Sequence, residues 1–380
     1  MKKGSVNQMI SIKEVTSKRD LKKFIQYPID LYKDNAYFVP SLSVDEMMNL
    51  DPKKNPAYEY CDVKMFLAYQ EGKIVGRICG IINHAHNQKT TGTRVRFNRF
   101  DVIDDIEVSK TLMGAVMDWA KQQGMNEVIG PLGFCDLDKQ GMLIKGFDQM
   151  NMFITYYNHE YYVRHMEQMG FTKDADWIEC KVFIPSDAIG RLERISELTI
   201  KRYGYQLIKP KTRKEAIPHA RVALQLYNIA FAPLYGVVPL TDRQIELFIK
   251  QFVLLVNLDY VLFVLNNQNE MIGFGLSFPS LAMAVRKSKG KLFPLGWLRL
   301  MRAIKHHTTV EMGLIAVKPE YQGRGVNALL LAEGVKAAIK HGVKVAETGP
   351  ELEDNNKVLS QWKDFEVEQH KTRRSWTKSF

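Results

Sequence analysis

The sequence predicts a mixed α/β protein made of two similar halves, each with a central mixed sheet and helices packed on its faces. Three landmarks predict this fold because each of them occurs twice, in the same order along the chain. They are an apolar hairpin, a helix that ends at a glycine before a buried strand and Gly-Pro, and a helix that leads into two closing strands. Chance similarity between two αβ segments is the alternative interpretation.

The landmarks define the expected elements of each half. The hairpins have two apolar runs around a short polar turn, which is typical of paired strands. The landmark segments are 66–83 and 260–278 for the hairpin, 119–131 and 337–350 for the helix with its glycine end, and 161–184 and 357–380 for the closing strands. We place the boundary near Pro185 to Gly190, so the domains are 1–187 and 188–380, and a helix-like stretch at 188–204 opens the second.

Composition limits the class of protein. The 380 residues fit two or three domains, and 46% hydrophobic with 25% charged residues indicate a folded chain. The sequence has neither an 18-residue apolar span nor a signal-peptide core, so we expect a cytoplasmic protein. The cysteine spacing fits no zinc site, which favours reduced, buried thiols and no metal at Cys61, Cys79, Cys135 and Cys180.

A glycine loop in the second half has the features of an anion site. The apolar stretch 309–317 predicts a strand, and apolar residues at helical spacing predict a helix that ends at Gly342. Gly323 and Gly325 therefore lie in a strand-to-helix turn, where backbone N–H groups and the helix dipole face one point and Arg324 adds a cation. A glycine turn without a ligand is the alternative. The loop is neither a Rossmann fingerprint nor a Walker A motif.

The stretch Gln322-Gly323-Arg324-Gly325-Val326-Asn327 resembles motif A of the general N-acetyltransferase (GNAT) superfamily, with the pattern Gln/Arg-x-x-Gly-x-Gly/Ala. Asn327 departs from the final Gly/Ala. The resemblance implies that these six residues bind the pyrophosphate of acetyl-CoA or another acyl-CoA. It also implies donor contacts from the strand backbone and from the helix start after the next strand, at Ile315, Ala316, Val317, Asn355 and Asn356. For the two asparagines, a helix N-cap is the alternative.

The resemblance extends over nearly the whole chain, through stretches such as VGRICGIINHAHN, GPLGF, PLYGVVPLT and GKLFPLGWLR. These resemble an uncharacterised bacterial family with two tandem GNAT-like halves. The first half lacks the glycine loop: its counterpart at 96–112 has no glycine and carries four carboxylates, which would repel a pyrophosphate. We therefore expect a degenerate N-terminal GNAT-like domain, which serves as scaffold or cleft wall, and a C-terminal GNAT domain that binds acyl-CoA.

Two carboxylates are candidates for the general base. Glu311 lies eleven residues before Gln322 on the expected strand, and a glutamate at this spacing acts as base in GNAT proteins that resemble histone acetyltransferases. Glu347, in the next apolar strand, is the second candidate. A salt-bridged carboxylate at the exposed start of a strand is the alternative for Glu311. The tyrosine that serves as general acid in many GNAT proteins is missing, since Trp362 stands near its place.

A basic stretch precedes the glycine-loop strand. No acidic residue lies between Glu270 and Glu311, and 286–307 is rich in lysine, arginine and histidine, with His306 and His307 expected on the surface. Leu298, Met301 and Ile304 share one helical face. This helix is expected to pack on its own domain. The alternatives are peripheral contact with an anionic membrane and contact with the CoA 3′-phosphate, an acidic acceptor or RNA.

The leading hypothesis is a CoA-dependent N-acyltransferase that acts on an amine acceptor, and the resemblance implies an N-acetyltransferase. The alternatives are a Fem-like transferase that uses aminoacyl-tRNA, which the net charge of +11 favours, and a non-catalytic acyl-CoA or lipid-binding protein. The intact glycine loop speaks against nucleic acid. The acceptor, the acyl length and the oligomeric state are open.

Overall fold

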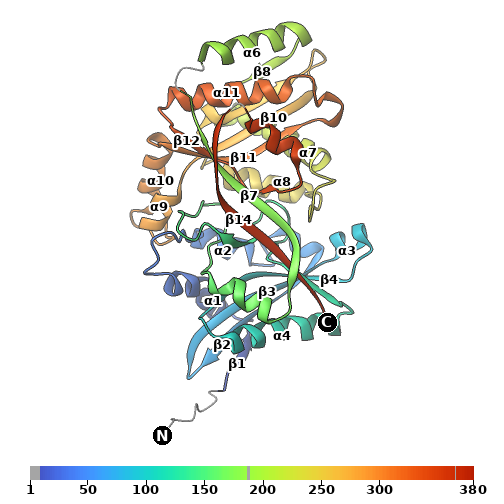
Figure 1. Cartoon of the computed structure of the whole chain (residues 1–380), viewed down its shortest axis with the longest axis vertical. Helices are drawn as coiled ribbons and strands as arrows, with labels where there is room; N and C mark the ends of the chain where they lie inside the picture. The colour runs from blue at the N-terminus through green and yellow to red at the C-terminus, as the bar shows by residue number, and fades with distance from the viewer. Residues whose placement is uncertain (1–8, 186–188, 364) are drawn as a thin grey trace. The chain divides into compact units, whose positions relative to one another are not determined.

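The computed structural model describes residues 9–185, 189–363 and 365–380, and these form two compact units (Figure 1). The first unit comprises the described residues up to Asn151, with Thr155–Asp176 and Arg373–Phe380. The second comprises Met152–Ile154 and the described part of Trp177–Thr372. Both are mixed α/β units, as the sequence predicts.

The first unit is a mixed sheet with helices on it. Its strands run β1-β2-β3-β4-β5-β14, antiparallel except for the parallel pair β4–β5. Its elements are β1 (Ser11–Glu14), α1 (Lys18–Leu31), α2 (Ser43–Asn49), η1 (Pro56–Glu59), β2 (Cys61–Gln70), β3 (Lys73–Asn83), α3 (His84–Thr90), β4 (Arg94–Val102), α4 (Ile106–Gln122), β5 (Glu127–Gly130), β6 (Met142–Lys145), α5 (Tyr161–Gln168) and the start of β7 (Thr172–Phe183).

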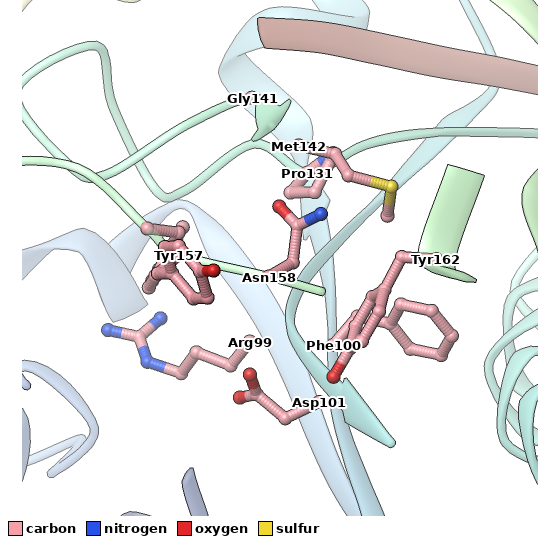
Figure 2. Close-up of a pocket in the computed structure, with 10 residues that line it drawn as sticks. Arg99, Phe100, Asp101, Pro131, Gly141, Met142, Tyr157, Asn158 and Tyr162 are labelled. Atoms are coloured by element: carbon pink, nitrogen blue, oxygen red, sulfur yellow. The ribbon is translucent and has the colours of Figure 1, made fainter. Parts of the chain in front are cut away.

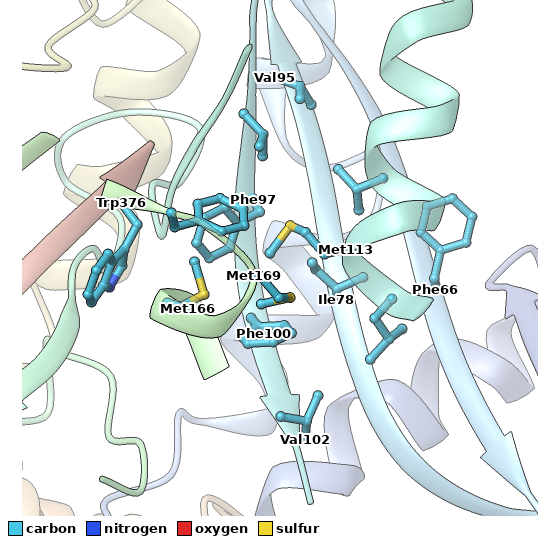
Figure 3. Close-up of a cluster of buried hydrophobic side chains, with 14 of the residues drawn as sticks. Phe66, Ile78, Val95, Phe97, Phe100, Val102, Met113, Met166, Met169 and Trp376 are labelled. Atoms are coloured by element: carbon cyan, nitrogen blue, oxygen red, sulfur yellow. The ribbon is translucent and has the colours of Figure 1, made fainter. Parts of the chain in front are cut away.

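The core of the first unit lies between its sheet and α4 (Figure 3). Side chains from β2, β3 and β4 meet Met113 and its neighbours on the inner face of α4. Trp376, from the far end of the chain, completes this core at 2% exposure. In the sheet, Trp376 of β14 lies opposite Gly130 of β5, some 250 positions earlier in the sequence. The core of the first unit therefore depends on the last strand of the chain.

The second unit repeats this plan. Its strands run β8-β9-β10-β11-β12-β7, with β11–β12 as the parallel pair. Its elements are the end of β7, α6 (Ile189–Tyr203), β8 (Gln206–Ile208), α7 (Arg213–Ala230), α8 (Asp242–Phe252), η2 (Leu258–Tyr260), β9 (Val261–Leu265), β10 (Met271–Pro279), α9 (Ala282–Lys287), α10 (Gly296–Lys305), β11 (Thr309–Val317), η3 (Pro319–Tyr321), α11 (Val326–Lys340), β12 (Val345–Glu347), β13 (Glu351–Leu352), α12 (Asn356–Leu359), η4 (Ser360–Trp362) and the start of β14 (Glu366–Ser379).

The predicted landmarks are confirmed with one correction. Both hairpins form, and α4 and α11 end at Gly124 and Gly342, which have φ values of +78° and +67° that suit glycine. The sequence predicts two closing strands in each half, and this is wrong: β7 and β14 are single strands of 12 and 14 residues. Polar residues along these strands resemble a turn, but the paired backbone continues through them.

Both long strands contribute to the two units. The residues of β7 up to Asp176 belong to the first unit, and those from Trp177 belong to the second. In β14 the order is reversed, because the residues up to Thr372 belong to the second unit and those from Arg373 to the first. Of the predicted boundary, residues 186–188 lie outside the described residues, so the limits 1–187 and 188–380 stay a prediction.

The basic stretch corrects the packing predicted for its helix. Of the face formed by Leu298, Met301 and Ile304, only Ile304 is buried. α10 packs instead through Gly296, Leu300 and Ile304, which are spaced by four residues and so form one line along the helix.

One of the two adjacent histidines is also not where the sequence predicts it. His307 is buried, and its Nε2 lies 2.7 Å from the Tyr260 hydroxyl. Burial and the neighbouring His341 lower the pKa of His307, so it adds no charge to the surface at neutral pH. His306 is exposed as expected.

The cysteine prediction is confirmed, because Cys61, Cys79, Cys135 and Cys180 are free thiols and buried. Within the described residues, no helix combines the length and hydropathy that crossing a membrane requires. The same residues contain no cluster of three or more His, Cys, Asp or Glu side chains arranged for a metal ion.

Replacement of Trp376 tests the dependence of the first core on β14. Trp376→Ala should lower the free energy of unfolding by about 3–5 kcal/mol, because a buried indole leaves a large cavity. Val367→Ala, on an exposed part of the same strand, should change it by less than about 0.5 kcal/mol. Urea unfolding followed by circular dichroism measures both, and equal effects would contradict this role of Trp376.

Candidate active site

The glycine loop forms the predicted strand-to-helix turn. β11 ends at Val317, η3 follows, and α11 starts directly after Gly325. Gly323 and Gly325 have φ values of +74° and +80°, where a Cβ is unfavourable. Because the N-cap of α11 is Gly325, no cap side chain accepts a hydrogen bond from the first helical turn. The turn therefore presents the positive end of a 15-residue helix, which suits an anion.

The two glycines differ in their surroundings. A Cβ on Gly323 would meet no atom within 4 Å, so its outer side is open. A Cβ on Gly325 would lie 2.8 Å from the Thr199 methyl carbon on α6, so this glycine also allows α6 to approach the loop. Arg324 is exposed, with its guanidinium 5.5 Å from the Tyr321 ring centre, while its carbonyl accepts a hydrogen bond from the Tyr205 hydroxyl. The loop is thus anchored on one side and accessible on the other.

Asn327, which departs from the GNAT pattern, has a partner inside the unit. Its Nδ2 donates to Oε1 of Gln361 in η4 at 3.2 Å. The side chain therefore joins the first turn of α11 to the segment after β13. Val326, beside it, is buried in a cluster with Leu329 and Leu330. The hydrogen bond to Gln361 gives the side chain of Asn327 a role that the glycine or alanine of the GNAT pattern could not fill.

β11 loses its neighbour on one side just after Glu311. The parallel pairing with β12 covers three pairs and ends where Glu311 lies opposite Glu347, whereas β11 stays paired with β10 up to Val317. A bulge at Gly313 interrupts the β10–β11 register. The predicted strand contacts Ile315, Ala316 and Val317 lie on this later part of β11, and Ile315 and Val317 are half-buried. This part of the β11 backbone is not paired with β12.

Glu311 is buried at the point where this pairing ends. Its side chain accepts hydrogen bonds from the Ser280 hydroxyl at 2.7 Å and from the Phe153 backbone N–H at 3.2 Å. Burial is the main cause that raises the pKa of Glu311 to about 7; the charge of Glu347 adds to the rise, and the Ser280 hydrogen bond opposes it. The alternative of an exposed salt-bridged carboxylate is wrong. A carboxyl group with this pKa can take up or release a proton near neutral pH.

Glu347 has a different environment from Glu311. One of its carboxylate oxygens lies 3.2 Å from Nζ of Lys371 and 3.6 Å from Nε2 of His370. Lys371 is fully buried and also contacts Glu179 at 3.0 Å. The second predicted base is therefore engaged with a buried cation, which suits a fixed charge more than a proton acceptor.

The segment after β12 contains the remaining predicted residues. Asn355 caps α12, where its side chain accepts from the Val358 N–H at 3.4 Å, and Asn356 is the first residue of that helix. Trp362 is buried, and its indole N–H lies 3.1 Å from both carboxylate oxygens of Glu351. Burial raises the pKa of Glu351 to about 7, which gives this segment a proton-carrying group.

Sequence reasoning missed the residues that surround the two acids. Ser280, Phe153 and Lys371 contact Glu311 or Glu347 from strands and loops far away in the sequence. No motif marks them. The one available signal was Lys371 itself, since a lysine inside an expected closing strand needs an acidic partner if it is buried.

The first unit uses its corresponding turn in another way. The loop between β4 and α4 is short, and Asp105 caps the helix by accepting from the Glu107 N–H at 2.9 Å. Asp101 accepts hydrogen bonds from Arg77 at 2.7 Å and from the Tyr32 hydroxyl at 3.1 Å. A carboxylate therefore already occupies the position of the helix N-terminus that an anion would take.

A small cavity lies beside these residues (Figure 2). Arg99, Asp101, Asn158 and Tyr162 are among the residues that line it. Its volume is about 20 Å³, which is room for roughly one water molecule. This cavity cannot hold the pantetheine chain of a CoA.

The comparisons with known proteins agree with this geometry. Residues 224–359, which include the glycine loop, Glu311 and Glu347, match the Acetyltransferase (GNAT) family. A solved tandem GNAT protein from the clavulanic acid biosynthesis pathway has a similar structure, with a TM-score of 0.56 at 13% sequence identity. The match covers 98% of each of the two chains. Residues 224–359 therefore match a GNAT domain, and the chain as a whole has the fold of a tandem GNAT protein. It contains two tandem GNAT-like domains.

Two curated relatives cover most of the chain. Protein YghO of Escherichia coli (strain K12) is 27% identical over 334 residues, which are 86% of this chain and 84% of the relative. A protein named bacterial ceramide synthase, from Caulobacter vibrioides (strain NA1000 / CB15N), is 25% identical over 323 residues, with 84% and 83% covered. A glucosamine N-acetyltransferase region of a fungal enzyme shares the GNAT fold, with a TM-score of 0.54 at 11% identity; the match covers 98% of this chain and 38% of the fungal chain.

The raised pKa of Glu311 predicts how its replacement changes stability with pH. An unfolded glutamate releases its proton near 4.5, whereas folded Glu311 holds it up to about 7. The folded state therefore loses stability relative to the unfolded state as the pH rises through this window. Glu311→Gln should remove that loss, which is on the order of 3 kcal/mol. Urea unfolding of both proteins at several pH values tests this, and a constant difference across the window would refute the raised pKa.

Proposed function

We propose that the protein is a CoA-dependent N-acyltransferase whose second unit binds the acyl donor and uses Glu311 as general base. The observation that carries the proposal is the combination of an open glycine loop at the N-terminus of α11 with a buried carboxyl group of pKa about 7 on the strand that leads into the loop. The match of residues 224–359 to the Acetyltransferase (GNAT) family supports a thioester donor and an amine acceptor.

The donor is expected to bind along β11 and the loop. The diphosphate of acyl-CoA would accept hydrogen bonds from the backbone of Gln322, Gly323, Arg324, Gly325, Val326 and Asn327, with Arg324 as a cation. The pantetheine would extend along Ile315, Ala316 and Val317, on the side where β12 no longer pairs. Backbone N–H groups of this strand segment would polarise the thioester carbonyl. Asn355 and Asn356 are proposed to border the other side.

The chemistry then follows from the position of Glu311. The carboxylate accepts a proton from the ammonium group of the acceptor, directly or through one water, and the amine nitrogen attacks the thioester carbon. The carbon–sulfur bond breaks as the tetrahedral intermediate collapses, the nitrogen releases its second proton to solvent, and the thiolate of CoA leaves. Glu351 lies in the segment after β12 with a pKa of about 7, and we propose it as a source of the proton for the thiolate. Glu347, paired with Lys371, helps to raise the pKa of Glu311.

The acyl group and the acceptor are proposed from the relatives. A ceramide synthase acylates a long-chain base, so the name of the Caulobacter relative favours a fatty acyl-CoA and a long-chain amine. Acetyl-CoA with a small amine is the alternative that the GNAT resemblance gives. Calorimetry with acetyl-CoA and palmitoyl-CoA distinguishes them. Transfer RNA retained in a filter-binding assay, without CoA binding, would favour an aminoacyl-tRNA-dependent transferase instead.

Replacement of Gly325 tests the donor site. Gly325→Glu should weaken CoA binding by more than about tenfold, because it puts a side chain at a left-handed position against α6 and a negative charge at the anion site. Gly342→Glu is the matched control, since Gly342 has a similar φ at the other end of the same helix and open space around it. Calorimetry measures both. Equal affinities for wild type and Gly325→Glu would refute this donor site.

The pH dependence of the reaction tests the base. In the wild type, kcat/KM should rise with pH up to about 7, as Glu311 loses its proton, and then level off. Glu311→Gln should lower kcat by about 10²–10⁴-fold and remove this rise. Glu347→Gln should keep an ascending limb, because the base itself is unchanged. If Glu347→Gln abolishes the limb while Glu311→Gln retains it, the two assignments must be exchanged.

A further inference from the structure

The segment between β10 and β11 combines two surface properties that are rare together. Fifteen large hydrophobic residues are exposed in the described part of the chain, and six of them fall within the 19 residues from 283 to 301. Phe293 is 80% exposed, and the others are 42% to 53% exposed: Met283, Leu295, Trp297, Leu298 and Met301. Such a concentration on a folded protein marks an interaction site.

Basic residues surround these apolar side chains. The stretch between Glu270 and Glu311 contains no acidic residue but has Arg286, Lys287, Lys289, Lys291, Arg299, Arg302 and Lys305, and all of these except Arg286 are exposed. On α10, Trp297, Leu298 and Met301 form an outer apolar face, and Arg299, Arg302 and Lys305 continue around the helix from it. We call α9, α10 and the turn between them the basic apolar surface.

The surface is held in place by its inner side. α10 buries Gly296, Leu300 and Ile304, and Arg299 donates a hydrogen bond to the Lys287 carbonyl of α9 at 2.9 Å. A Cβ on Gly296 would lie 1.9 Å from the Lys291 carbonyl oxygen, so the turn and the helix start are in close contact. The exposed side chains therefore project from packed helices, and they need no internal partner for this fold to be stable.

We propose that the basic apolar surface docks the protein on an anionic lipid bilayer. Apolar side chains would enter the region between headgroups and acyl chains, where phenylalanine and tryptophan are favoured, while lysine and arginine contact the anionic headgroups. A nucleic acid would account for the cations but not for Phe293, Leu295 and Trp297. A second copy of this chain would bring the same positive charge against itself, and the net charge is +11.

The docking segment is attached to the candidate active site at both of its ends. This segment, residues 281–308, begins after Ser280, which follows β10 and whose hydroxyl binds Glu311. It ends before Thr309 of β11, whose carbonyl accepts from the Ser280 N–H at 3.0 Å. If the proposed function holds, docking would bring Glu311 to an amine that is carried by an amphiphile in the bilayer. That link rests on the proposed function, whereas docking itself does not.

Vesicle co-sedimentation tests the docking surface on the full chain. The wild type should sediment with phosphatidylcholine vesicles that contain phosphatidylglycerol, much less with phosphatidylcholine alone, and less at high salt. Phe293→Ser combined with Trp297→Ser, and separately Lys291→Glu combined with Lys305→Glu, should each weaken binding by more than about tenfold. The matched controls change exposed residues on α7 and α8: Val222→Ser with Ile229→Ser, and Lys214→Glu with Lys250→Glu.

Three outcomes would overturn the proposal. They are a wild type that stays in the supernatant, control variants that lose binding as much as the surface variants, and a wild-type dimer in sedimentation analysis that only the surface variants dissociate. Acyl transfer from acetyl-CoA and palmitoyl-CoA to a water-soluble amine and to a long-chain amine in detergent micelles, assayed separately without vesicles, distinguishes the two proposals. Vesicle binding without any transfer rejects the proposed function alone, and transfer without vesicle binding rejects docking alone.

Discussion

The end of the pairing between β11 and β12 is the constraint on which the candidate site depends. Three residue pairs hold these parallel strands together, and the last of them joins Glu311 and Glu347. Beyond this point β11 continues with β10 alone, so one edge of its backbone is no longer used by β12. A strand edge of this kind can bind an extended chain through its main-chain groups, and the glycine loop at the end of the same strand can bind an anion.

The carboxyl groups of Glu311 and Glu347 would destabilise the fold if both were charged and neither had a cation as partner. A buried and a half-buried negative charge on adjacent strands repel each other, and burial penalises the charged form. The fold separates their roles by giving Glu347 the buried cation Lys371 and Glu311 only neutral donors, a hydroxyl and a backbone N–H. Glu347 is therefore paired with a cation, while the pKa of Glu311 is raised to about 7. This asymmetry is the physical basis for the assignment of Glu311 as base.

The two units have the same arrangement of strands and helices but differ in the polar residues at the turn before α4 and before α11. In the second unit the turn before α11 keeps its helix N-terminus free of side-chain caps, through Gly325. In the first unit Asp105 caps α4, and Asp101 is bound by Arg77 and Tyr32. Carboxylates that would repel a pyrophosphate serve there to hold the fold together. This supports a structural role for the first unit in the proposed enzyme, as the absence of its glycine loop indicates.

The sequence by itself determined the repeated α/β plan, the glycine turn, the strand that carries Glu311 and the lack of a counterpart loop in the first half. These are local patterns of apolar spacing, glycine and charge, and such patterns act through neighbours in the sequence. Tertiary structure alone decided which acid has a cation, because Lys371 follows Glu347 by 24 positions and reaches it from another strand. It also decided that Asn327 bonds Gln361, that β7 and β14 are each one long strand, and that α10 turns Trp297 and Met301 outward. Each of these depends on a partner brought close by folding, and no spacing along the chain encodes that partner.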